Sequence, residues 1–404
     1  IDAVIETHTH ADHVSGHGEI ARRGGARIYV HELAGVAFPH QDLHDGDTLI
    51  FGDLRVRVLH TPGHTPEHIA LIVSDINRSR EPWLVLTGDS LFVGDVARPD
   101  LAVPGAEGAD ALYNSIFSRL LELRDGVEVY PSHVAGSLCG RSMNMKASST
   151  IGFERRCNPA LAPRSRADFV RAMNENLPQR PANMACILEH NRRNYTDCTP
   201  VPVPKLLDSA AYQDALAEGA LVLDTRQPEY FCEGHIPGSL HAYLHSLTFP
   251  TYVGFVTPPA SRLVLVVENE QDCVEARTQL TVVGYEHIVG YLVENREPGL
   301  LSEPLGQVSA RQLYEQYENV TIVDIRESHE WQEGHIEGAL HIPYYEIEQR
   351  LGELNPAEPV MVLCAGSQRS VGACALLLRH GFQQMFHVSG GMGAWREARL
   401  PETW

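Results

Sequence analysis

An internal repeat constrains the fold of this 404-residue chain more than any single motif does. The segment ALVLDTRQPEYFCEGHIPGSLHA at 220–242 matches VTIVDIRESHEWQEGHIEGALHI at 320–342, one hundred residues further along the chain. Each copy continues with an apolar strand, a helix and another strand, so each encodes one α/β domain. The matched positions are Asp224 and Asp324, Arg226 and Arg326, Gly234 and Gly334, His235 and His335, and Gly238 and Gly338. The C-terminal half is therefore predicted to hold two copies of one domain.

The residues before the repeat alternate short β-rich runs with turns of Gly, Pro and Asp, and they contain one long helical pattern at 109–123. A polar helical stretch at 165–195 then leads into CTPVPVPK at 198–205, whose alternating prolines cannot continue a helix. The chain is long enough for two to four domains. We predict a multidomain α/β protein with domains at 1–197, 198–302 and 303–404.

The composition of the chain argues against several classes of binding partner. The formal net charge of −20 opposes binding to nucleic acid or anionic lipid, because both carry negative charge. The longest apolar runs, such as LVLVV at 263–267, are far shorter than the ~18 residues that span a bilayer. Eight cysteines without a C-x-x-C pair suit a reducing compartment. We therefore predict a cytoplasmic protein with no nucleic-acid or membrane partner, and we leave open whether it forms a homo-oligomer.

Metal-ligand side chains crowd into the segment THTHADH near the N-terminus and recur at the ends of three predicted strands further on. Loops at strand ends converge at one edge of a fold, so these side chains are expected to meet. Seven such groups together predict a metal site. They are His8, His10, Asp12, His13, His64 in HTPGHTPEH, Asp89 in LTGDSLF and His133 in YPSHVAG.

This set resembles the metallo-β-lactamase fold superfamily, whose H-x-H-x-D-H signature is complete in THTHADH. The resemblance implies a sandwich of two sheets with helices outside and metal at one edge. Only seven residues precede the signature here, whereas the family carries several strands before it. N-terminal strands of the first sheet are therefore expected to be missing.

The residues leave two kinds of metal site open. If all seven bind, the site is a dinuclear zinc centre like that of the glyoxalase II thioesterases, with Asp89 bridging. If only His8, His64 and Asp89 bind, they form a two-His, one-carboxylate triad that leaves positions on a single Fe(II) for a thiolate and O2. Four residues then orient ligands and substrate instead: His10, Asp12, His13 and His133.

The segment SSTIGFERRCNPAL after His133 resembles the matching segment of the ethylmalonic-encephalopathy-type persulfide dioxygenases. In that family an Arg at the position of Arg155 contacts the carboxylate of glutathione persulfide. Two features depart from the family: Ala135 stands where an aromatic residue is expected, and GSLCGRSMNMKA replaces a short loop. The resemblance therefore implies a persulfide substrate whose thiol carrier is glutathione, coenzyme A or another small thiol.

Cys139 lies in this inserted loop, six residues beyond His133. Two interpretations remain open. A free cysteine is commonly a small buried apolar residue. Its closeness in sequence to His133 also allows it to bind or relay sulfur at the metal. Arg155 and its basic neighbours are either a solvated face or a source of positive charge for an anionic substrate.

In the second copy the strand PVMVL runs into CAGSQRS and then a helix, which places Cys364 at the positive end of that helix. Backbone N–H groups in such a loop stabilise an anion and lower a thiol's pKa. The pattern D-x-R…G-H-I-x-G-A…C-x4-R over 305–400 is similar to the rhodanese family of sulfurtransferases. The four residues between Cys364 and Arg369 fit a sulfane-sulfur cradle: Ala365, Gly366, Ser367 and Gln368.

The resemblance implies that Cys364 carries sulfane sulfur as a persulfide, with Arg369 adding a fixed charge. Asp324 and Arg326 are predicted to form a structural ion pair, and His335 to be structural. In the first copy Val267 aligns with Cys364 and Asp272 with Arg369. That copy is therefore predicted to be catalytically inactive.

Taken together, the chain resembles the persulfide dioxygenase–rhodanese fusion proteins of bacterial sulfide detoxification. The resemblance implies that O2 and an Fe(II) site convert a thiol persulfide to sulfite, and that Cys364 passes sulfane sulfur to sulfite to give thiosulfate. The alternative is a dinuclear zinc thioesterase with a sulfurtransferase tail.

Overall fold

Strand β6 (Ile69–Asp75) shows why the N-terminal residues fold into layers, because both of its faces are buried. Its odd-numbered residues, Ile69, Leu71 and Val73, pack into one apolar cluster. Ala70 and Ile72 point the other way into a second cluster. Successive side chains of a strand face opposite sides of the sheet, so a strand that is apolar throughout must be covered on both sides.

The two clusters belong to different interfaces of the first unit. The cluster of Ile69 also holds Tyr29 and Leu43 from a second sheet, whereas the cluster of Ala70 holds Leu112 and Phe169 from helices. A third cluster joins Ile28, on the outer face of that second sheet, to the first helix through Ala21. The layers are therefore helix, sheet, sheet and helix, which is the sandwich that the family resemblance predicts.

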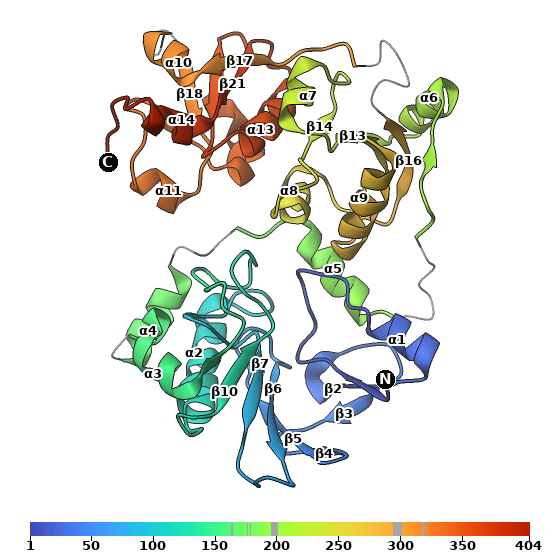
Figure 1. Ribbon diagram of the computed structural model, residues 1–404, viewed down its shortest axis with the longest axis vertical. Helices are drawn as coiled ribbons and strands as arrows, with labels where there is room; N and C mark the ends of the chain where they lie inside the picture. The colour runs from blue at the N-terminus through green and yellow to red at the C-terminus, as the bar shows by residue number, and fades with distance from the viewer. Residues whose placement is uncertain (163–164, 176, 178, 195–200, 294–300, 317–319) are drawn as a thin grey trace. The chain divides into compact units, whose positions relative to one another are not determined.

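The computed structural model gives these layers the following elements (Figure 1). The smaller sheet is parallel, in the order β1 (Ala3–Ile5), β2 (Arg27–His31), β3 (Gln41–Leu43). The larger sheet has the order β11 (Ser149–Thr150), β10 (Glu128–Pro131), β7 (Leu84–Gly88), β6, β5 (Leu54–His60), β4 (Thr48–Phe51). A short hairpin joins β8 (Leu91–Phe92) and β9 (Asp95–Val96). The helices are α1 (His17–Gly24), α2 (Gly105–Ser115), α3 (Ile151–Cys157), α4 (Arg166–Asn174) and α5 (Asn183–Arg192).

The helix predicted at 109–123 begins earlier and ends earlier than expected. α2 starts at Gly105 and is continued only by a π-helical turn, Ile116–Leu120. Leu112, Ile116 and Leu120 are all fully buried against the larger sheet. The apolar spacing thus predicts the buried face of the helix, but it does not indicate the change from α-helix to π-helix at Ile116.

The structure describes residues 1–162, 165–175, 177, 179–194, 201–293, 301–316 and 320–404. The chain divides into two units, residues 1–180 with 184–199, and residues 181–183 with 200–404. Part of the predicted linker, 198–200, lies outside the described residues. The finer division into domains at 1–197, 198–302 and 303–404 stays a prediction.

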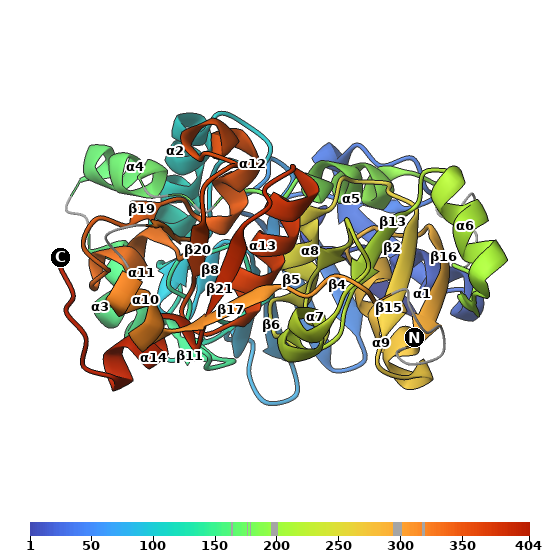
Figure 2. The same cartoon turned by 90° about the horizontal axis from the view of Figure 1, so that it is seen from above.

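The second unit contains two five-stranded parallel sheets with the same strand order. This is the arrangement that the sequence repeat predicts. The first sheet runs β12 (Lys205–Leu206), β16 (Ile288–Val293), β15 (Leu263–Val267), β13 (Leu221–Asp224), β14 (Leu240–His241). The second runs β17 (Gly306–Ser309), β21 (Met385–Ser389), β20 (Val360–Leu363), β18 (Thr321–Asp324), β19 (Leu340–His341), with α13 (Gln368–Arg379) packed against β20 and β21 (Figure 2).

The remaining helices of the second unit flank these sheets. The central strands β15 and β20 are buried along their whole length, as parallel strands covered on both faces must be. The helices around the first sheet are α6 (Ser209–Ala217), α7 (Pro228–Glu233), α8 (Phe249–Val256) and α9 (Glu270–Val282). Those around the second are α10 (Ala310–Gln316), α11 (Ser328–Gln332), α12 (Ile347–Arg350), α13 and α14 (Gly391–Glu397).

No helix in the described part of the chain is long and apolar enough to cross a membrane. The cytoplasmic location stays a prediction.

A buried ion pair closes the end of the second strand in both copies, and this confirms the predicted pairing of Asp324 with Arg326. The guanidinium Nη2 of Arg326 lies 2.6 Å from Asp324 Oδ2, and both side chains are almost fully buried. Arg326 also donates to the backbone oxygens of Glu330 and Gly334, so it ties β18 to the segment after α11. Arg226 makes the same contacts with Asp224 and with Gly234 O. His335 is structural as predicted, since its ring stacks on Trp331.

We expect Asp324→Asn to lower the free energy of unfolding of the second unit by about 3–5 kcal/mol, because it leaves the Arg326 charge buried and unpaired. Urea unfolding followed by circular dichroism measures the change. Arg399→Ala, on the exposed surface after α14, is the control and should change stability little. Wild-type stability in Asp324→Asn would contradict a structural role for the pair.

Candidate metal centre and cysteine loop

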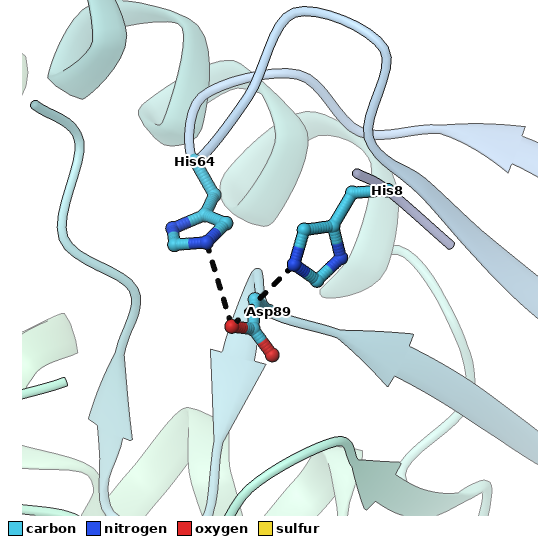
Figure 3. Close-up of side chains that lie close together, drawn as sticks. All are labelled: His8, His64 and Asp89. Atoms are coloured by element: carbon cyan, nitrogen blue, oxygen red, sulfur yellow. Dashed lines mark ion pairs between the residues drawn. The ribbon is translucent and has the colours of Figure 1, made fainter. Parts of the chain in front are cut away.

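Three side chains from separate loops converge on one point of the first unit (Figure 3). His8 follows β1, His64 follows β5, and Asp89 directly follows β7. The Nε2 atoms of His8 and His64 lie 3.7 and 3.4 Å from Asp89 Oδ2. All three side chains are buried, and their ligand atoms lie within 4.8 Å of one another, so they are able to hold a metal ion.

The backbone around Asp89 is fixed by a neighbouring histidine. Asp89 N–H donates to His68 Nε2 at 2.8 Å, and His68 Nδ1 lies 2.9 Å from Thr61 Oγ1. Gly88 has φ +51°, and a Cβ atom there would lie 2.6 Å from His68 Nε2. Only glycine fits this approach, so the GD pair of LTGDSLF is needed to turn the carboxylate toward the histidines.

The donor atoms of this cluster fit a metal ion. Among the described residues, neither carboxylate oxygen of Asp89 has a hydrogen-bond partner, although both are buried. Burial raises the pKa of Asp89, but His8 and His133 outweigh that effect and hold it well below its usual range. Burial and the neighbouring His10 hold the pKa of His8 well below 6.5. A charged carboxylate beside a neutral imidazole is the state that binds a divalent ion.

A second group of possible ligands adjoins the first. His10, Asp12 and His133 bring their ligand atoms within 4.8 Å of one another. His133 Nε2 lies 3.2 Å from Asp12 Oδ2 and 3.4 Å from Asp89 Oδ2. Burial lowers the pKa of His133, but the two carboxylates outweigh it and raise the pKa to about 9. The structure therefore brings six of the seven predicted residues together in two adjacent groups.

The seventh predicted residue, His13, belongs to neither ligand group of the described chain. Its Nδ1 lies 3.0 Å from Asp12 Oδ1, and its side chain is 36% exposed. These contacts hold the pKa of Asp12 at about 2, although burial alone would raise it. His13 therefore orients the Asp12 carboxylate, and its ring lies 4.2 Å from that of His10.

Cys139 lies next to the metal-ligand cluster and is also a buried apolar residue. It packs with Phe92, Ala97 and Met143. Its sulfur lies within 4.8 Å of ligand atoms of Asp89 and His133. Burial raises the pKa of Cys139 well above its usual value, and the charge of Asp89 adds to this. The two interpretations of Cys139 are thus compatible, because the thiol is buried in an apolar cluster and also lies beside the ligand atoms.

Arg155 is held elsewhere than the prediction requires. Its guanidinium pairs with Asp125 and donates to the backbone oxygens of Leu121 and Leu123. Arg156 pairs with the same carboxylate. In the inserted loop, Arg141 donates to the backbone oxygen of Ala172. A substrate-binding role for Arg155 stays a prediction, and such a role requires it to leave Asp125.

Sequence reasoning missed Arg98, which links a predicted metal ligand to the Cys139 loop. Its backbone oxygen accepts from His64 Nδ1 at 3.0 Å, which leaves His64 Nε2 free to face Asp89. Its backbone N–H donates to Cys139 O, and its buried guanidinium forms a two-point pair with Asp100. The signal available in the sequence was an arginine in a run of apolar and small residues, VGDVARPD.

Cys364 occupies the first position of the loop between β20 and α13, as predicted. The following α14 holds that loop closely: Met392 N–H donates to Cys364 O at 2.8 Å, and Gly393 N–H donates to Ala365 O. A Cβ atom on Gly391 would lie 2.1 Å from Cys364 O. This approach explains the paired glycines of VSGGMGAW, which sequence reasoning passed over.

Arg369 is paired instead of standing as an unopposed charge. Its two terminal nitrogens lie 2.7 and 2.8 Å from the carboxylate oxygens of Glu330 on α11. Burial raises the pKa of Glu330, but this pair outweighs it and lowers the pKa. The charge of Arg369 is thus largely offset within the loop. Glu330 was missed because it lies in a different motif, thirty-nine residues away.

The first copy lacks this loop. Four residues, 364–367, separate β20 from α13, whereas only Glu268 and Asn269 separate β15 from α9. The position that aligns with Cys364 is Val267, at the end of β15. Asp272 stands three residues into α9, where burial raises its pKa. These features agree with the predicted absence of a nucleophile.

Two family models match the chain in separate regions. The metallo-beta-lactamase superfamily model matches residues 1–133, and the rhodanese-like domain model matches residues 309–398. The mitochondrial persulfide dioxygenase ETHE1 of Homo sapiens is 31% identical over 193 residues, which are 45% of this chain and 68% of that protein. The Bos taurus protein of the same name is 30% identical with the same coverage.

The chain belongs to the metallo-β-lactamase superfamily. A crystal structure described as a metallo-beta-lactamase from Staphylococcus aureus is 28% identical, with a TM-score of 0.64 over 72% of this chain and 84% of that one. The predicted combination of this fold with a C-terminal rhodanese-like domain is confirmed. The rhodanese-like match covers the copy that contains Cys364, and the assignment of 198–302 as an inactive copy stays a prediction.

We expect Asp89→Ala to abolish metal binding, because it removes the only carboxylate of the triad. Affinity should fall by more than about a hundredfold, since even residues behind the ligands account for 10–100-fold. Elemental analysis of the purified variant measures this, with circular dichroism to verify folding. Asp12→Ala is the matched control, and with a single-metal site it should keep the wild-type metal content. Retention of metal by Asp89→Ala would rule out the triad.

Proposed function

We propose that the first unit oxidises a small thiol persulfide with O2 to sulfite at one Fe(II) ion, and that Cys364 transfers sulfane sulfur to that sulfite, which gives thiosulfate. The observation that carries the proposal is the buried triad of His8, His64 and Asp89 in a chain similar to persulfide dioxygenases. Two imidazoles and one carboxylate are the donor set of mononuclear Fe(II) oxygenases. Iron held there would supply the chemistry with O2 that no amino-acid side chain provides.

The two activities balance as consecutive reactions. The first converts RSSH, O2 and water into RSH, sulfite and two protons. The second moves sulfane sulfur from another RSSH to sulfite, which gives thiosulfate and RSH. The product of the first reaction is thus the acceptor of the second, which gives one protein a reason to carry both sites.

The residues around the triad would position the substrate. Asp12 and His133 form a charged pair beside the triad and would orient a bound persulfide. Cys139 lies beside the same ligand groups, in an apolar cluster with Phe92 and Met143. Its thiol lies close enough to Asp89 and His133 to exchange sulfur with a persulfide held between them.

In the second unit Cys364 would hold the transferred sulfur. Its loop offers backbone N–H groups at the start of α13, where the helix dipole favours an anion. Because Arg369 is already paired with Glu330, this part of the loop carries little net positive charge. A donor whose reacting group carries one negative charge, as a persulfide group does, therefore suits the loop better than one whose reacting group carries two.

The substrates in this proposal are a thiol persulfide, O2 and sulfite. Glutathione and coenzyme A are both candidates for the thiol. Arg155 would contact a carrier carboxylate only after release from Asp125. The departure from the family loop around Cys139 favours a carrier other than glutathione.

The second candidate function is a dinuclear zinc thioesterase with a sulfurtransferase tail. The group formed by His10, Asp12 and His133 favours it, because these residues adjoin Asp89 and offer donors for a second ion. Two zinc ions per chain and thioester hydrolysis would distinguish this function from the first.

We expect Cys364→Ser to consume O2 nearly as fast as the wild type but to release sulfite in place of thiosulfate, because only sulfur transfer requires the thiol. Oxygen-electrode traces and ion chromatography of the same reactions measure both quantities. Cys374→Ser is the matched control, since Cys374 is buried in α13, ten residues beyond Cys364, and should leave thiosulfate as the product. Loss of O2 uptake in Cys364→Ser would contradict two separable activities.

A further inference from the structure

Three side chains in hydrogen-bond contact lead from the Cys364 sulfur into the core of the domain. Cys364 Sγ lies 3.5 Å from Ser370 Oγ, which lies 3.1 Å from His387 Nδ1. Ser370 is in the first turn of α13, and His387 is on β21, where it pairs with Val362 of β20. All three side chains are almost fully buried. Nothing in the function proposed so far uses Ser370 or His387.

We propose that His387 is a positioning residue for sulfur transfer, which acts through Ser370 to stabilise negative charge on Cys364 Sγ. The inference rests on the proposed role of Cys364 as the residue that carries sulfur. When sulfite attacks the outer sulfur of the Cys364 persulfide, the S–S bond breaks and its electron pair stays on Sγ. Thiosulfate, the Cys364 thiolate and one proton are the products. A hydroxyl that donates to Sγ makes it a better leaving group.

The hydrogen bonds of Ser370 show why a partner is needed. Ser370 has one hydroxyl proton, and three acceptors surround it: Ser367 O at 2.9 Å, His387 Nδ1 and Cys364 Sγ. When Cys364 is a thiol, its S–H donates to Ser370 Oγ. When Cys364 is a thiolate, Ser370 must turn its proton toward sulfur, and its oxygen then accepts from a neighbour.

His387 is able to be that neighbour because it is neutral and has two nitrogens. A neutral imidazole carries its proton on either nitrogen, so Nδ1 accepts from Ser370 in one state and donates to it in the other. Burial lowers the pKa of His387 to about 4, and His241 adds to this. His387 Nε2 lies 3.4 Å from Ser389 Oγ, a hydroxyl that both donates and accepts. The tautomer is therefore free to change with the charge on Cys364.

The first copy of the repeat is an internal comparison for this assignment. Positions that serve the scaffold are the same in both copies, including His241 and His341, whose Nε2 atoms each bond an arginine backbone oxygen. The three positions that form this hydrogen-bonded series in the second copy all hold different residues in the first copy. Val267 replaces Cys364, Cys273 replaces Ser370, and Tyr291 replaces His387 on the paired strand. The serine and the histidine are thus absent where the thiol is absent.

Besides the backbone N–H groups of the loop, the described polar side chains near Cys364 have other partners. Arg369 is occupied by Glu330. The Tyr252 hydroxyl, from α8, donates to Arg369 O at 3.3 Å. The titratable and charged groups that face Cys364 or His387 from the packed elements are Arg369, Glu330, Tyr252, Tyr344, Cys374 and His241.

The test measures how fast iodoacetamide alkylates Cys364 at each pH, with the Cys364 peptide followed by mass spectrometry in the full chain. We expect the midpoint of that profile to rise by about one pH unit in His387→Leu and in Ser370→Ala, because a hydrogen bond to a charged group is lost. The double variant should rise no further than either single variant. His387→Asn, which retains an amide donor, should restore part of the shift.

His341→Leu is the matched control, because it removes a half-buried histidine of the same domain whose ring nitrogen bonds Arg326 O rather than the Cys364 side. Its profile should match the wild type. A wild-type profile in His387→Leu, or additive shifts in the double variant, would overturn the inference. If wild-type protein fails to form thiosulfate while the alkylation shifts appear, the proposed function fails and the inference about Ser370 and His387 stands.

Discussion

The first unit depends on one costly arrangement: a fully buried carboxylate, Asp89, whose oxygens have no hydrogen-bond partner among the described residues. An unpaired buried charge is strongly destabilising, so a fold keeps one only where something compensates it. Here the compensation comes from histidines that face it and, in our account, from a metal ion. The rest of the site serves this arrangement, because Gly88, His68 and Arg98 hold the carboxylate and its neighbours in place.

The two copies in the second unit share one scaffold and differ in the loop after the central strand. Both copies keep the buried Asp–Arg pair and the parallel sheet, which maintain the fold. They differ in the connection after the central strand, where four residues lie between strand and helix in the second copy and two in the first. Ser370 and His387, which we propose support the thiol, are replaced in the first copy, whereas the ion pair is kept.

The sequence was sufficient to predict the layered fold, the repeat, the convergence of His8, His64 and Asp89, and the position of Cys364 in its loop. Each of these predictions rests on a local pattern or on strand ends that must meet. It was insufficient where the partner is distant in sequence. Glu330 beside Arg369, His387 beside Ser370 and Asp125 beside Arg155 come from other elements, and no spacing rule connects them. It also could not separate a single-metal site from a double one, since the same residues serve both and only the metal content distinguishes them.

The most direct test of the central claim is O2 uptake by purified, Fe(II)-loaded protein after addition of glutathione persulfide or coenzyme A persulfide, with metal content measured on the same sample. The account predicts rapid uptake with about one iron per chain, as expected for a two-His, one-carboxylate site. No uptake from a sample that binds two zinc ions per chain and hydrolyses thioesters would contradict it.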